Sequence, residues 1–431
     1  MSRPRVVIVG AGFAGYQAAR RLSRREKDQV EVVLISPEDY FLYVPLLPEV
    51  ATGVLEARRI TVPLAGTLPE VRMVLGTVDA VDLDRRQVGF TDPEGRRGDI
   101  GYDRLLLAAG SVNKLLPIPG VTEHAHGFRT LPEALYLRDH VTRQIELADT
   151  ASDAAEATAR CTFVVVGAGY TGTEVAAHGV LFTRALARQH PRLERAGIRP
   201  RWLLLDVADR VLPELGERLS ADADRVLRQR GVAVRTGMSV AEAGHDGVRL
   251  TDDTFVRTRS LIWCVGVRPD PLVADVGLET VQGRLAVDSY LNVPGRPEVF
   301  AAGDAAAVPD LTHPGAITPM TAQHATRHGA AAARNIAASL GHGERRPYRH
   351  RDLGFAVDLG GLQATADPLH VPLSGPLAKA VTSGYHLLSL PGNRVRVTAD
   401  WLLDAMLPRQ AAQLGLVRGH AVPLEHASPH P

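Results

Sequence analysis

The sequence predicts an α/β fold in which one strand–turn–helix unit occurs twice, with a small α+β region at the C-terminal end. The first observation is a glycine signature, Gly-x-Gly-x-x-Gly, that occurs at 10–15 and again at 167–172. The second is that each copy follows a β-branched apolar run, at 5–9 and 162–166, and precedes an Ala-rich run typical of a helix. This order is that of a Rossmann-like unit, so we expect two of them.

Each glycine of the signature has its own physical task. The first turns the chain tightly, the second lets the backbone approach a pyrophosphate, and the third lets helix and strand pack closely. The pyrophosphate then rests on unpaired N–H groups at the positive end of the helix. These glycines are Gly10, Gly12 and Gly15 in the first copy and Gly167, Gly169 and Gly172 in the second. The sequence therefore predicts two bound dinucleotides.

The duplication extends beyond the glycines. Each copy closes with an apolar strand that ends in glycine, at Gly110 and at Gly266. Gly110 lies 100 residues after Gly10, and Gly266 lies 99 residues after Gly167. Such agreement indicates an internal repeat of two doubly wound units.

Between signature and closing strand, each copy carries two short β-type stretches. We expect 71–75 to form a hairpin with 87–90, and 232–235 to do so with 247–250.

Composition agrees with a protein of cytoplasmic type. The 431 residues suffice for two or three domains, and 49 basic against 48 acidic residues indicate no nucleic-acid partner. The first strand begins by Arg5, so we expect no signal peptide. No run reaches the length of a spanning helix, so any contact with the inner face of the cell membrane would be peripheral. We identify no metal site.

The cysteines exclude one kind of chemistry. Cys161 and Cys264 are the only two, and neither has a partner at the C-x-x-x-x-C spacing of redox pairs. Both fall on apolar strand runs and are interpreted as buried small hydrophobic residues.

A third segment extends the pattern. The strand-like run 299–302 leads into Gly303 and Asp304. With the two signatures, it resembles the two-dinucleotide-binding flavoprotein reductases. The resemblance implies FAD in the first unit, with Asp304 at its ribitol, and NAD(P)H in the second.

The residues expected to contact ribose differ between the units. An acidic residue about 20 residues beyond the signature normally accepts the ribose hydroxyls. The first unit has Ser36 there, with Glu38 two residues on. The second has Asp206, which repels a 2′-phosphate and favours NADH, although nearby Arg210 is a residue type that accepts such a phosphate.

Two segments narrow the family. Two segments resemble those of type II NADH:quinone oxidoreductases, namely 40–53 and 318–329 with its A-Q-x-A-x-x-x-G pattern. Glu174, just after the second signature, also resembles that family. The resemblance covers 5–361 and continues more loosely to Trp401.

The family implies roles for particular residues. Gln323 would line the quinone site, and Glu174 would assist proton delivery near the flavin with a raised pKa. His324 is a second candidate proton source, and Lys379 lies where relatives carry a cation at the quinone site, although a solvated lysine is the expectation from sequence. Further cofactor contacts are implied at Pro45, Ala109 and Ala322, beside Gly110 and Gly266.

We expect an FAD-binding domain formed by 1–115 and 296–345, and a C-terminal interface region at 346–431. Between the two parts of the first domain we expect an NAD-binding domain at 116–295, in which 116–158 is a connecting segment. In that region we expect a hairpin at 354–366, helices at 378–390 and 395–406, and a disordered tail from Pro423. Arginines beside 395–406 suit a membrane-surface helix, and an ordinary core-facing helix is the alternative.

The function that follows is hydride transfer from NADH to FAD and two-electron transfer to a quinone, without proton pumping. Two alternatives stay open: a soluble NAD(P)H-dependent flavin reductase with a ferredoxin or small-molecule acceptor, and a non-enzymatic dinucleotide-binding redox sensor. The sequence leaves a homodimer open and does not identify the quinone.

Overall fold

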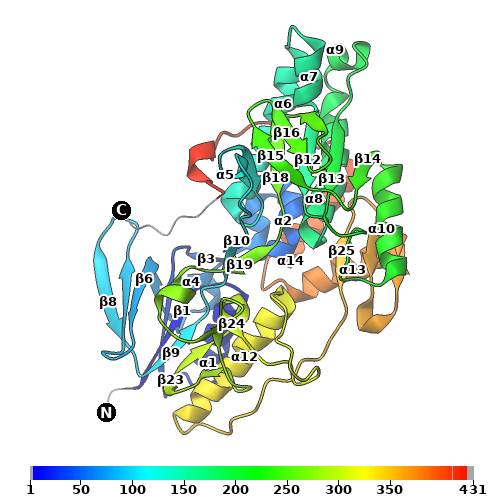
Figure 1. The fold of residues 1–431 in the computed structure, drawn as a ribbon. Helices are drawn as coiled ribbons and strands as arrows, with labels where there is room; N and C mark the ends of the chain where they lie inside the picture. Colours follow the sequence, from blue (N-terminus) through cyan, green and yellow to red (C-terminus); the bar gives the residue numbers. More distant parts are fainter. Residues whose placement is uncertain (1–2, 410, 425–431) are drawn as a thin grey trace.

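The computed structural model describes residues 3–409 and 411–424, which form two stacked units with a C-terminal region packed beside them (Figure 1). Each unit is built on a mainly parallel sheet whose central strands are almost wholly buried. The last residues of the expected tail, 425–431, lie outside the described residues.

The first unit contains a six-stranded sheet of order β22-β23-β9-β1-β2-β5. Its strands are β1 (Arg5–Val9), β2 (Glu31–Ser36), β5 (Arg72–Leu75), β9 (Arg104–Leu107), β22 (Asn292–Val293) and β23 (Arg296–Ala301). All neighbours are parallel except β22 and β23. Helices α1 (Phe13–Arg25) and α12 (Ala322–Ser339) pack against each other, so closely that a Cβ on Gly329 would overlap the carbonyl oxygen of Ala14.

The second unit repeats this plan with a five-stranded parallel sheet of order β11-β18-β12-β13-β14. Its strands are β11 (Ala125–Gly127), β12 (Thr162–Val166), β13 (Arg201–Leu205), β14 (Val232–Arg235) and β18 (Ser260–Trp263). Its helices are α5 (Val121–His124), α6 (Leu131–Asp149), α7 (Ala154–Arg160), α8 (Tyr170–Ala187), α9 (Pro191–Arg195) and α10 (Glu217–Gln229). Stacked Phe163 and Trp202 anchor its core.

The expected hairpins are wrong in both units. Residues 72–75 and 232–235 form β5 and β14, which pair in parallel with β2 and β13 at the sheet edges. The antiparallel pairs lie further on, in the three-stranded sheets β6-β7-β8 and β15-β16-β17. These strands are β6 (Thr77–Asp82), β7 (Gln87–Thr91), β8 (Arg97–Gly101), β15 (Val240–Gly244), β16 (Gly247–Leu250) and β17 (Phe255–Arg257). Because the strand pairing differs from the expectation in the same way in both copies, the two units resemble each other more closely than the sequence indicated.

Short elements link the units. The strand after Gly110, β10 (Ser111–Asn113), pairs antiparallel with the strand after Gly266, β19 (Val267–Pro269). Strands β20 (Thr280–Val281), β21 (Arg284–Ala286) and β24 (Ala306–Ala307) form a small sheet, and β3 (Tyr40–Leu42) pairs with β4 (Thr61–Pro63). The remaining helices here are η1 (Val44–Leu46), α2 (Leu47–Ala51), α3 (Ala57–Ile60), α4 (Leu64–Thr67), α11 (Leu272–Asp275) and η2 (Gly303–Ala305).

The C-terminal region contains the expected hairpin, β25 (Ala356–Asp358) with β26 (Ala364–Ala366), extended by β27 (Leu373–Ser374). Two helices follow, α13 (Gly375–Ser389) and α14 (Arg394–Met406), with single turns η3 (Pro368–His370) and η4 (Gly419–Ala421). Helix α14 ends two residues before Pro408, which cannot continue a helix ladder. Among the described residues, no helix is both long and apolar enough to span a bilayer.

We propose the domain division expected from sequence, with one adjustment. Strands β21 and β22 pair with β24 and β23, which follow them. The second part of the FAD-binding domain therefore begins by Arg284 rather than at residue 296.

Candidate functional site

The first glycine signature has the geometry of a phosphate-binding turn. Gly10 has φ +93°, and a Cβ there would overlap the carbonyl oxygen of Ala108. A Cβ on Gly15 would overlap the carbonyl oxygen of Gly10, so both positions are closed to larger residues by the protein itself. Gly12 differs, because a Cβ there would meet no atom within 4 Å. Only the middle glycine faces open space, as backbone that must approach a ligand does.

The second signature repeats this pattern. Gly167, with φ +100°, is packed against the carbonyl oxygen of Cys264, and Gly172 is packed against that of Gly167. A Cβ on Gly169 would again meet nothing within 4 Å. Both sites therefore leave the same opening for a pyrophosphate.

The two helix N-termini are free to bind an anion. Helix α1 starts after Gly12 and α8 after Gly169, and neither start has a side-chain cap or an acidic residue in its first turn. Their first N–H groups thus have no side-chain acceptor and lie at the positive end of the helix dipole. The residues present fit two dinucleotide pyrophosphates.

Asp304 lies beside the closing strand of the first unit. Its Oδ2 accepts a hydrogen bond of 2.7 Å from the Ser111 hydroxyl, and Arg129 Nη2 donates to the same hydroxyl at 3.3 Å. A Cβ on Gly110 would lie 3.8 Å from Arg129 Nη2. Gly303 has φ +72° and faces Ala14 of α1. The structure thus brings Gly110 and Asp304 together and adds Ser111 and Arg129, which no sequence motif marked.

The ribose-reading positions lie at the ends of β2 and β13. Ser36 is buried, and its hydroxyl accepts a 3.3 Å hydrogen bond from the Glu38 backbone N–H. Desolvation raises the pKa of Glu38. Asp206 accepts from the backbone N–H of Ala168, within the second signature, and from that of Ala208 at 2.8 Å.

Arg210 does not face a phosphate site. Its Nη2 donates to the carbonyl oxygens of Pro213 at 3.0 Å and Leu215 at 3.2 Å, and Nη1 lies 3.7 Å from Glu217. Its guanidinium is thus hydrogen-bonded within its own loop.

Helix α12 begins at Ala322, with Thr321 as its cap. Gln323 Nε2 donates to the Gly354 carbonyl oxygen at 3.3 Å, while its Oε1 is buried with no partner among the described residues. His324 Nδ1 lies 3.0 Å from the Tyr348 hydroxyl. Burial lowers the pKa of His324 to about 4, so its imidazole is neutral near pH 7 and carries no extra proton to donate.

Glu174 and Lys379 meet at strand β25. Glu174 Oε1 accepts from the Asp358 backbone N–H at 2.9 Å, and Lys379 Nζ donates to Asp358 Oδ2 at 2.5 Å and to Glu49 Oε1 at 3.4 Å. The expectation that Lys379 is solvated is therefore wrong. Burial opposes its charge, but Glu49 and Asp358 outweigh that effect and raise the pKa of Lys379.

Burial raises the pKa of Glu174 well above its ordinary value. It also raises the pKa of Glu49 to about 8, against the attraction of Lys379. Burial alone would raise the pKa of Asp358 too, but His178 and Lys379 hold it well below the usual range.

The sequence did not single out Glu49, Asp358 or His178. The available signal was a charge within a mainly apolar stretch, at Glu49 in 40–53 and Asp358 in 354–361.

Cys161 is buried, Cys264 is only partly buried, and neither lies on a strand. Cys161 caps α7 before β12, and Cys264 follows β18 directly, so the strand placement was wrong by one residue in each case. Burial raises the pKa of Cys161 to about 11 and that of Cys264 to about 12. Such thiols are poor nucleophiles at neutral pH.

The remaining predicted contacts lie in turns outside the strands of the two large sheets. Pro45 is in η1, Ala109 and Gly110 follow β9, and Gly266 follows β18 with φ +98°.

Comparison with known proteins gives a consistent result. Residues 4–329 match the pyridine nucleotide-disulphide oxidoreductase family. The chain is 31% identical over 426 residues to a type II NADH:quinone oxidoreductase, Ndh, of Mycobacterium tuberculosis, covering 95% of this chain and 89% of that protein. It is 29% identical to the demethylphylloquinone reductase NdbB of Synechocystis sp., covering 93% and 96%. Its fold matches the structure of NDH2 from Plasmodium falciparum in complex with NADH, with a TM-score of 0.88, 18% identity, and coverage of 95% and 100%.

Proposed function

Because the chain belongs to the pyridine nucleotide-disulphide oxidoreductase family and, within it, to the type II NADH:quinone oxidoreductases, we infer that it oxidises NADH and reduces a quinone. When bound, FAD supplies the redox chemistry, accepting a hydride from NADH and giving two electrons to the quinone. The observation that carries this inference is the pair of signatures whose middle glycines alone face open space.

We propose that the first signature, with Ser36 and Asp304, holds FAD, and that the second, with Asp206, holds NADH. Free N–H groups at the starts of α1 and α8 bind the two pyrophosphates. Asp206 is already fixed against the second signature by Ala168, which suits it to accept ribose hydroxyls. Because Arg210 is held by backbone carbonyls, it is not free to pair with a 2′-phosphate, which favours NADH over NADPH.

We propose that Gln323 and Lys379 line the quinone site and that Glu174 assists proton delivery. Gln323 keeps an unpaired amide oxygen, so its amide has hydrogen-bonding capacity to spare for a ligand. Strand β25 connects these residues: Gly354, just before it, accepts from Gln323, and Asp358, at its end, contacts both Glu174 and Lys379. Burial raises the pKa of Glu174 and so favours its protonated form, as a proton donor requires.

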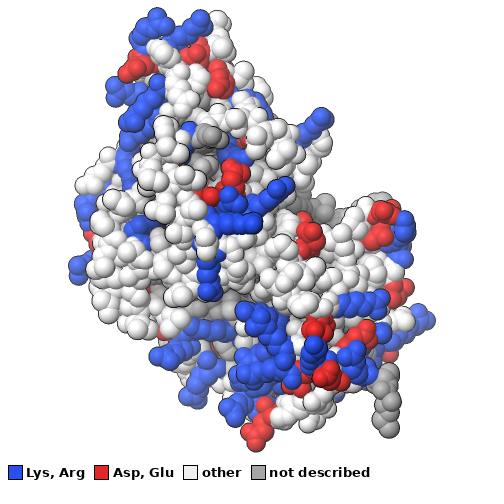
Figure 2. Space-filling model, turned by 180° about the vertical axis from the view of Figure 1, so that it is seen from behind, with Lys and Arg blue, Asp and Glu red and all other residues white. Residues whose placement is uncertain are grey.

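We propose that α13 and α14 contact the inner face of the cell membrane, where NADH is available. Leu388, Val395, Leu402 and Met406 each expose more than half of their surface. The side of the molecule where α13 lies is largely free of charged side chains when seen from behind (Figure 2). An exposed apolar face of this kind buries into a lipid interface or against a second copy of the chain. Flotation with vesicles, together with sedimentation of the free protein, separates the two.

The test of the function is anaerobic stopped-flow of the FAD-loaded protein. NADH should bleach the flavin absorbance, and a water-soluble quinone should restore it rapidly. Gln323→Leu should slow the second step and spare the first, because it removes the amide but keeps a side chain of similar size. Fast bleaching followed by no reaction with quinone would contradict the proposed acceptor, and equal damage to both steps would contradict the role of Gln323.

A further inference from the structure

A buried cluster of charged side chains lies beside the proposed quinone site. Glu49 on α2, Glu174 on α8, Asp358 on β25 and Lys379 on α13 are joined by the contacts described above, and His178 on α8 lies 3.5 Å from Asp358 Oδ2. Glu49 is 3% exposed, so its carboxyl is shielded from bulk water.

The cluster contains more acid than base. Three carboxyl groups face two cations, Lys379 and Arg230, whose guanidinium donates to the carbonyl oxygens of Leu359 and Gly360 beside Asp358, and burial lowers the pKa of His178. A buried excess of negative charge is costly, so carboxyl groups in such a place bind protons. Asp358 is the ionised member, because its oxygens accept from Gly360 N–H at 2.8 Å and from Lys379. Glu49 and Glu174 are the carboxyl groups left to bind protons, and the pKa of Glu49, about 8, keeps it protonated at neutral pH.

No other nearby charge neutralises Glu49. Its Oε2 accepts a 2.6 Å hydrogen bond from Trp401 Nε1 on α14, while burial and the negative charge of Asp358 raise its pKa. The charged groups on adjacent elements are engaged elsewhere: Asp400 on α14 pairs with Arg59 at 2.8 Å, and Arg138 on α6 lies 4.0 Å from Glu56. His386 on α13 lies 3.1 Å from the Tyr43 hydroxyl, and burial lowers its pKa to about 4.

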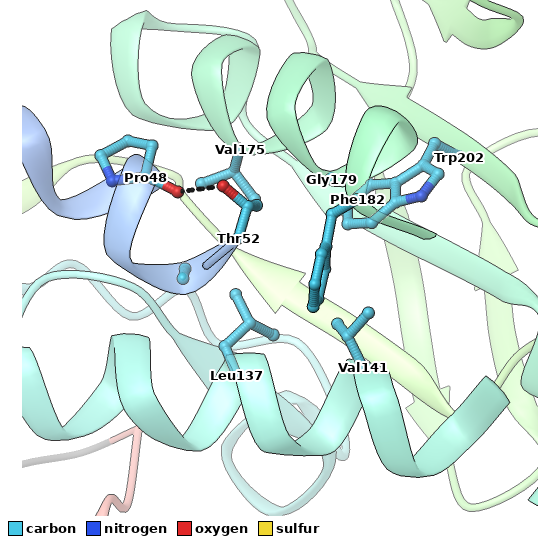
Figure 3. A pocket seen from close by; sticks show the side chains of 9 residues that line it. Pro48, Thr52, Leu137, Val141, Val175, Gly179, Phe182 and Trp202 are labelled. Atoms are coloured by element: carbon cyan, nitrogen blue, oxygen red, sulfur yellow. Dashed lines mark hydrogen bonds between the residues drawn. The ribbon is translucent and has the colours of Figure 1, made fainter. Parts of the chain in front are cut away.

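The other face of α2 is closed to proton transfer. Pro48, Ala51 and Thr52 share that face and line a small cavity with side chains of α6 and α8. Figure 3 shows this cavity surrounded by Leu137, Val141, Phe182 and other apolar groups, with the Thr52 hydroxyl turned to the Pro48 carbonyl oxygen at 2.9 Å. This apolar lining offers a water molecule too few hydrogen-bond partners to bind there. A proton on Glu49 therefore has its polar neighbours on the side of Lys379.

We propose that Glu49 is the residue that returns a proton to Lys379 after Lys379 has protonated the reduced quinone. The inference rests on the proposed function. The reaction is NADH + H⁺ + quinone → NAD⁺ + quinol, so the hydride supplies two electrons and one proton, and one further proton comes from water. An N–H bond of Lys379 breaks as an O–H bond forms on the quinone oxygen. The O–H bond of Glu49 then breaks as the N–H bond of Lys379 forms again. After the quinol has left, water reaches the cluster at Lys379, whose side chain is 18% exposed, and returns the proton to the Glu49 carboxylate through it.

The direction of the second transfer is downhill. A neutral Lys379 is the stronger base, because its pKa is raised above the ordinary 10.5 while that of Glu49 is about 8. The two groups already lie 3.4 Å apart, so no rearrangement is needed.

Glu49→Gln tests the proposal, because it keeps the shape and the acceptor for Trp401 but removes the proton that Glu49 transfers. In steady-state turnover with NADH and a water-soluble quinone, the rate should fall about tenfold or more at pH 7, since general acid–base groups typically contribute factors of about 10² to 10⁴. The first reoxidation in single-turnover stopped-flow uses the proton already on Lys379 and should be unchanged. The wild-type rate should decline above about pH 8, and this decline should be absent from the variant. Bleaching by NADH should be unchanged. The matched control is Asp400→Asn, another buried carboxylate of the same region, which should keep the wild-type pH profile.

Trp401→Phe provides a test that keeps the Glu49 carboxyl. Trp401 donates to the ionised form, so its loss should raise the pKa of Glu49 and move the decline to higher pH. A wild-type pH profile in Glu49→Gln, equal losses in both half-reactions, or an unmoved decline in Trp401→Phe would overturn the proposal. If the wild-type protein itself does not reduce quinone, the proposed function fails first, before any variant is compared.

Discussion

Replacing the middle glycine of the second signature should separate nucleotide binding from folding. Gly169 has φ −71° and ψ −165°, which alanine adopts without strain, and a Cβ there meets nothing within 4 Å. At such a position Gly→Ala restricts the unfolded chain and stabilises the fold by about 0.4–1 kcal/mol. Gly169→Ala should thus melt at or slightly above the wild-type temperature.

The substitution should weaken the binding of NADH. The added methyl group occupies the space through which the backbone approaches the pyrophosphate, so at least one charged hydrogen bond is lost. Such bonds contribute about 1.5–3 kcal/mol, which corresponds to a rise in Kd of roughly 10- to 150-fold.

Titration calorimetry with NADH on the FAD-loaded protein measures this rise, and differential scanning calorimetry measures the melting temperature. Gly66→Ala on α4 is the matched control, because its Cβ also meets open space, far along the chain from both signatures. Gly172→Ala should instead lose stability, because its Cβ overlaps the Gly167 carbonyl oxygen. Wild-type NADH affinity in Gly169→Ala would refute the assignment of the second site.

Three further outcomes are expected. Asp206→Ala should raise the KM for NADH by the equivalent of about 1–3 kcal/mol and leave the KM for quinone unchanged; an unchanged KM for NADH would remove Asp206 from the site. Glu174→Gln should have a higher melting temperature than wild type at pH 8 but not at pH 4. The native Glu174 carboxyl binds its proton more tightly than the unfolded one, so wild-type stability falls as pH rises above 4.5. A difference in melting temperature that is independent of pH would contradict the raised pKa. Leu402→Glu with Met406→Glu should abolish vesicle flotation while keeping turnover with a water-soluble quinone, and retained flotation would place the membrane contact elsewhere.

The sequence was sufficient where structure is local. The two signatures, their strands and their helices follow from residues within about twenty positions of one another, and all were found. The pairing of 72–75 was missed because a parallel edge strand is set by its neighbour β2, across a connection of 35 residues from Ser36 to Arg72 that no local pattern encodes.

The charged cluster could not be predicted from the sequence for the same reason. Glu49, Glu174, Asp358 and Lys379 come from four distant elements, and their pKa shifts exist only after those elements pack. Lys379 shows this most clearly, since a lysine beside Ala and Leu in a helix gives no sign that two carboxyl groups will meet it. Sequence reasoning selected Glu174 and Lys379 but not Glu49 and Asp358, which pack against Lys379.

The strand order of the first sheet has a consequence for synthesis of the chain. Strand β9 ends at Leu107, but its partner β23 pairs first through Val299, 192 residues later. At about 5–20 residues per second, a ribosome takes roughly 10–40 s to cover that distance. During this interval the backbone of β9 has an unpaired edge, whereas all five strands of the second sheet, from Ala125 to Trp263, are complete. The second unit therefore has all its strands before the first does, although the chain begins with the first, and a nascent chain stalled before Val299 lacks a finished first sheet.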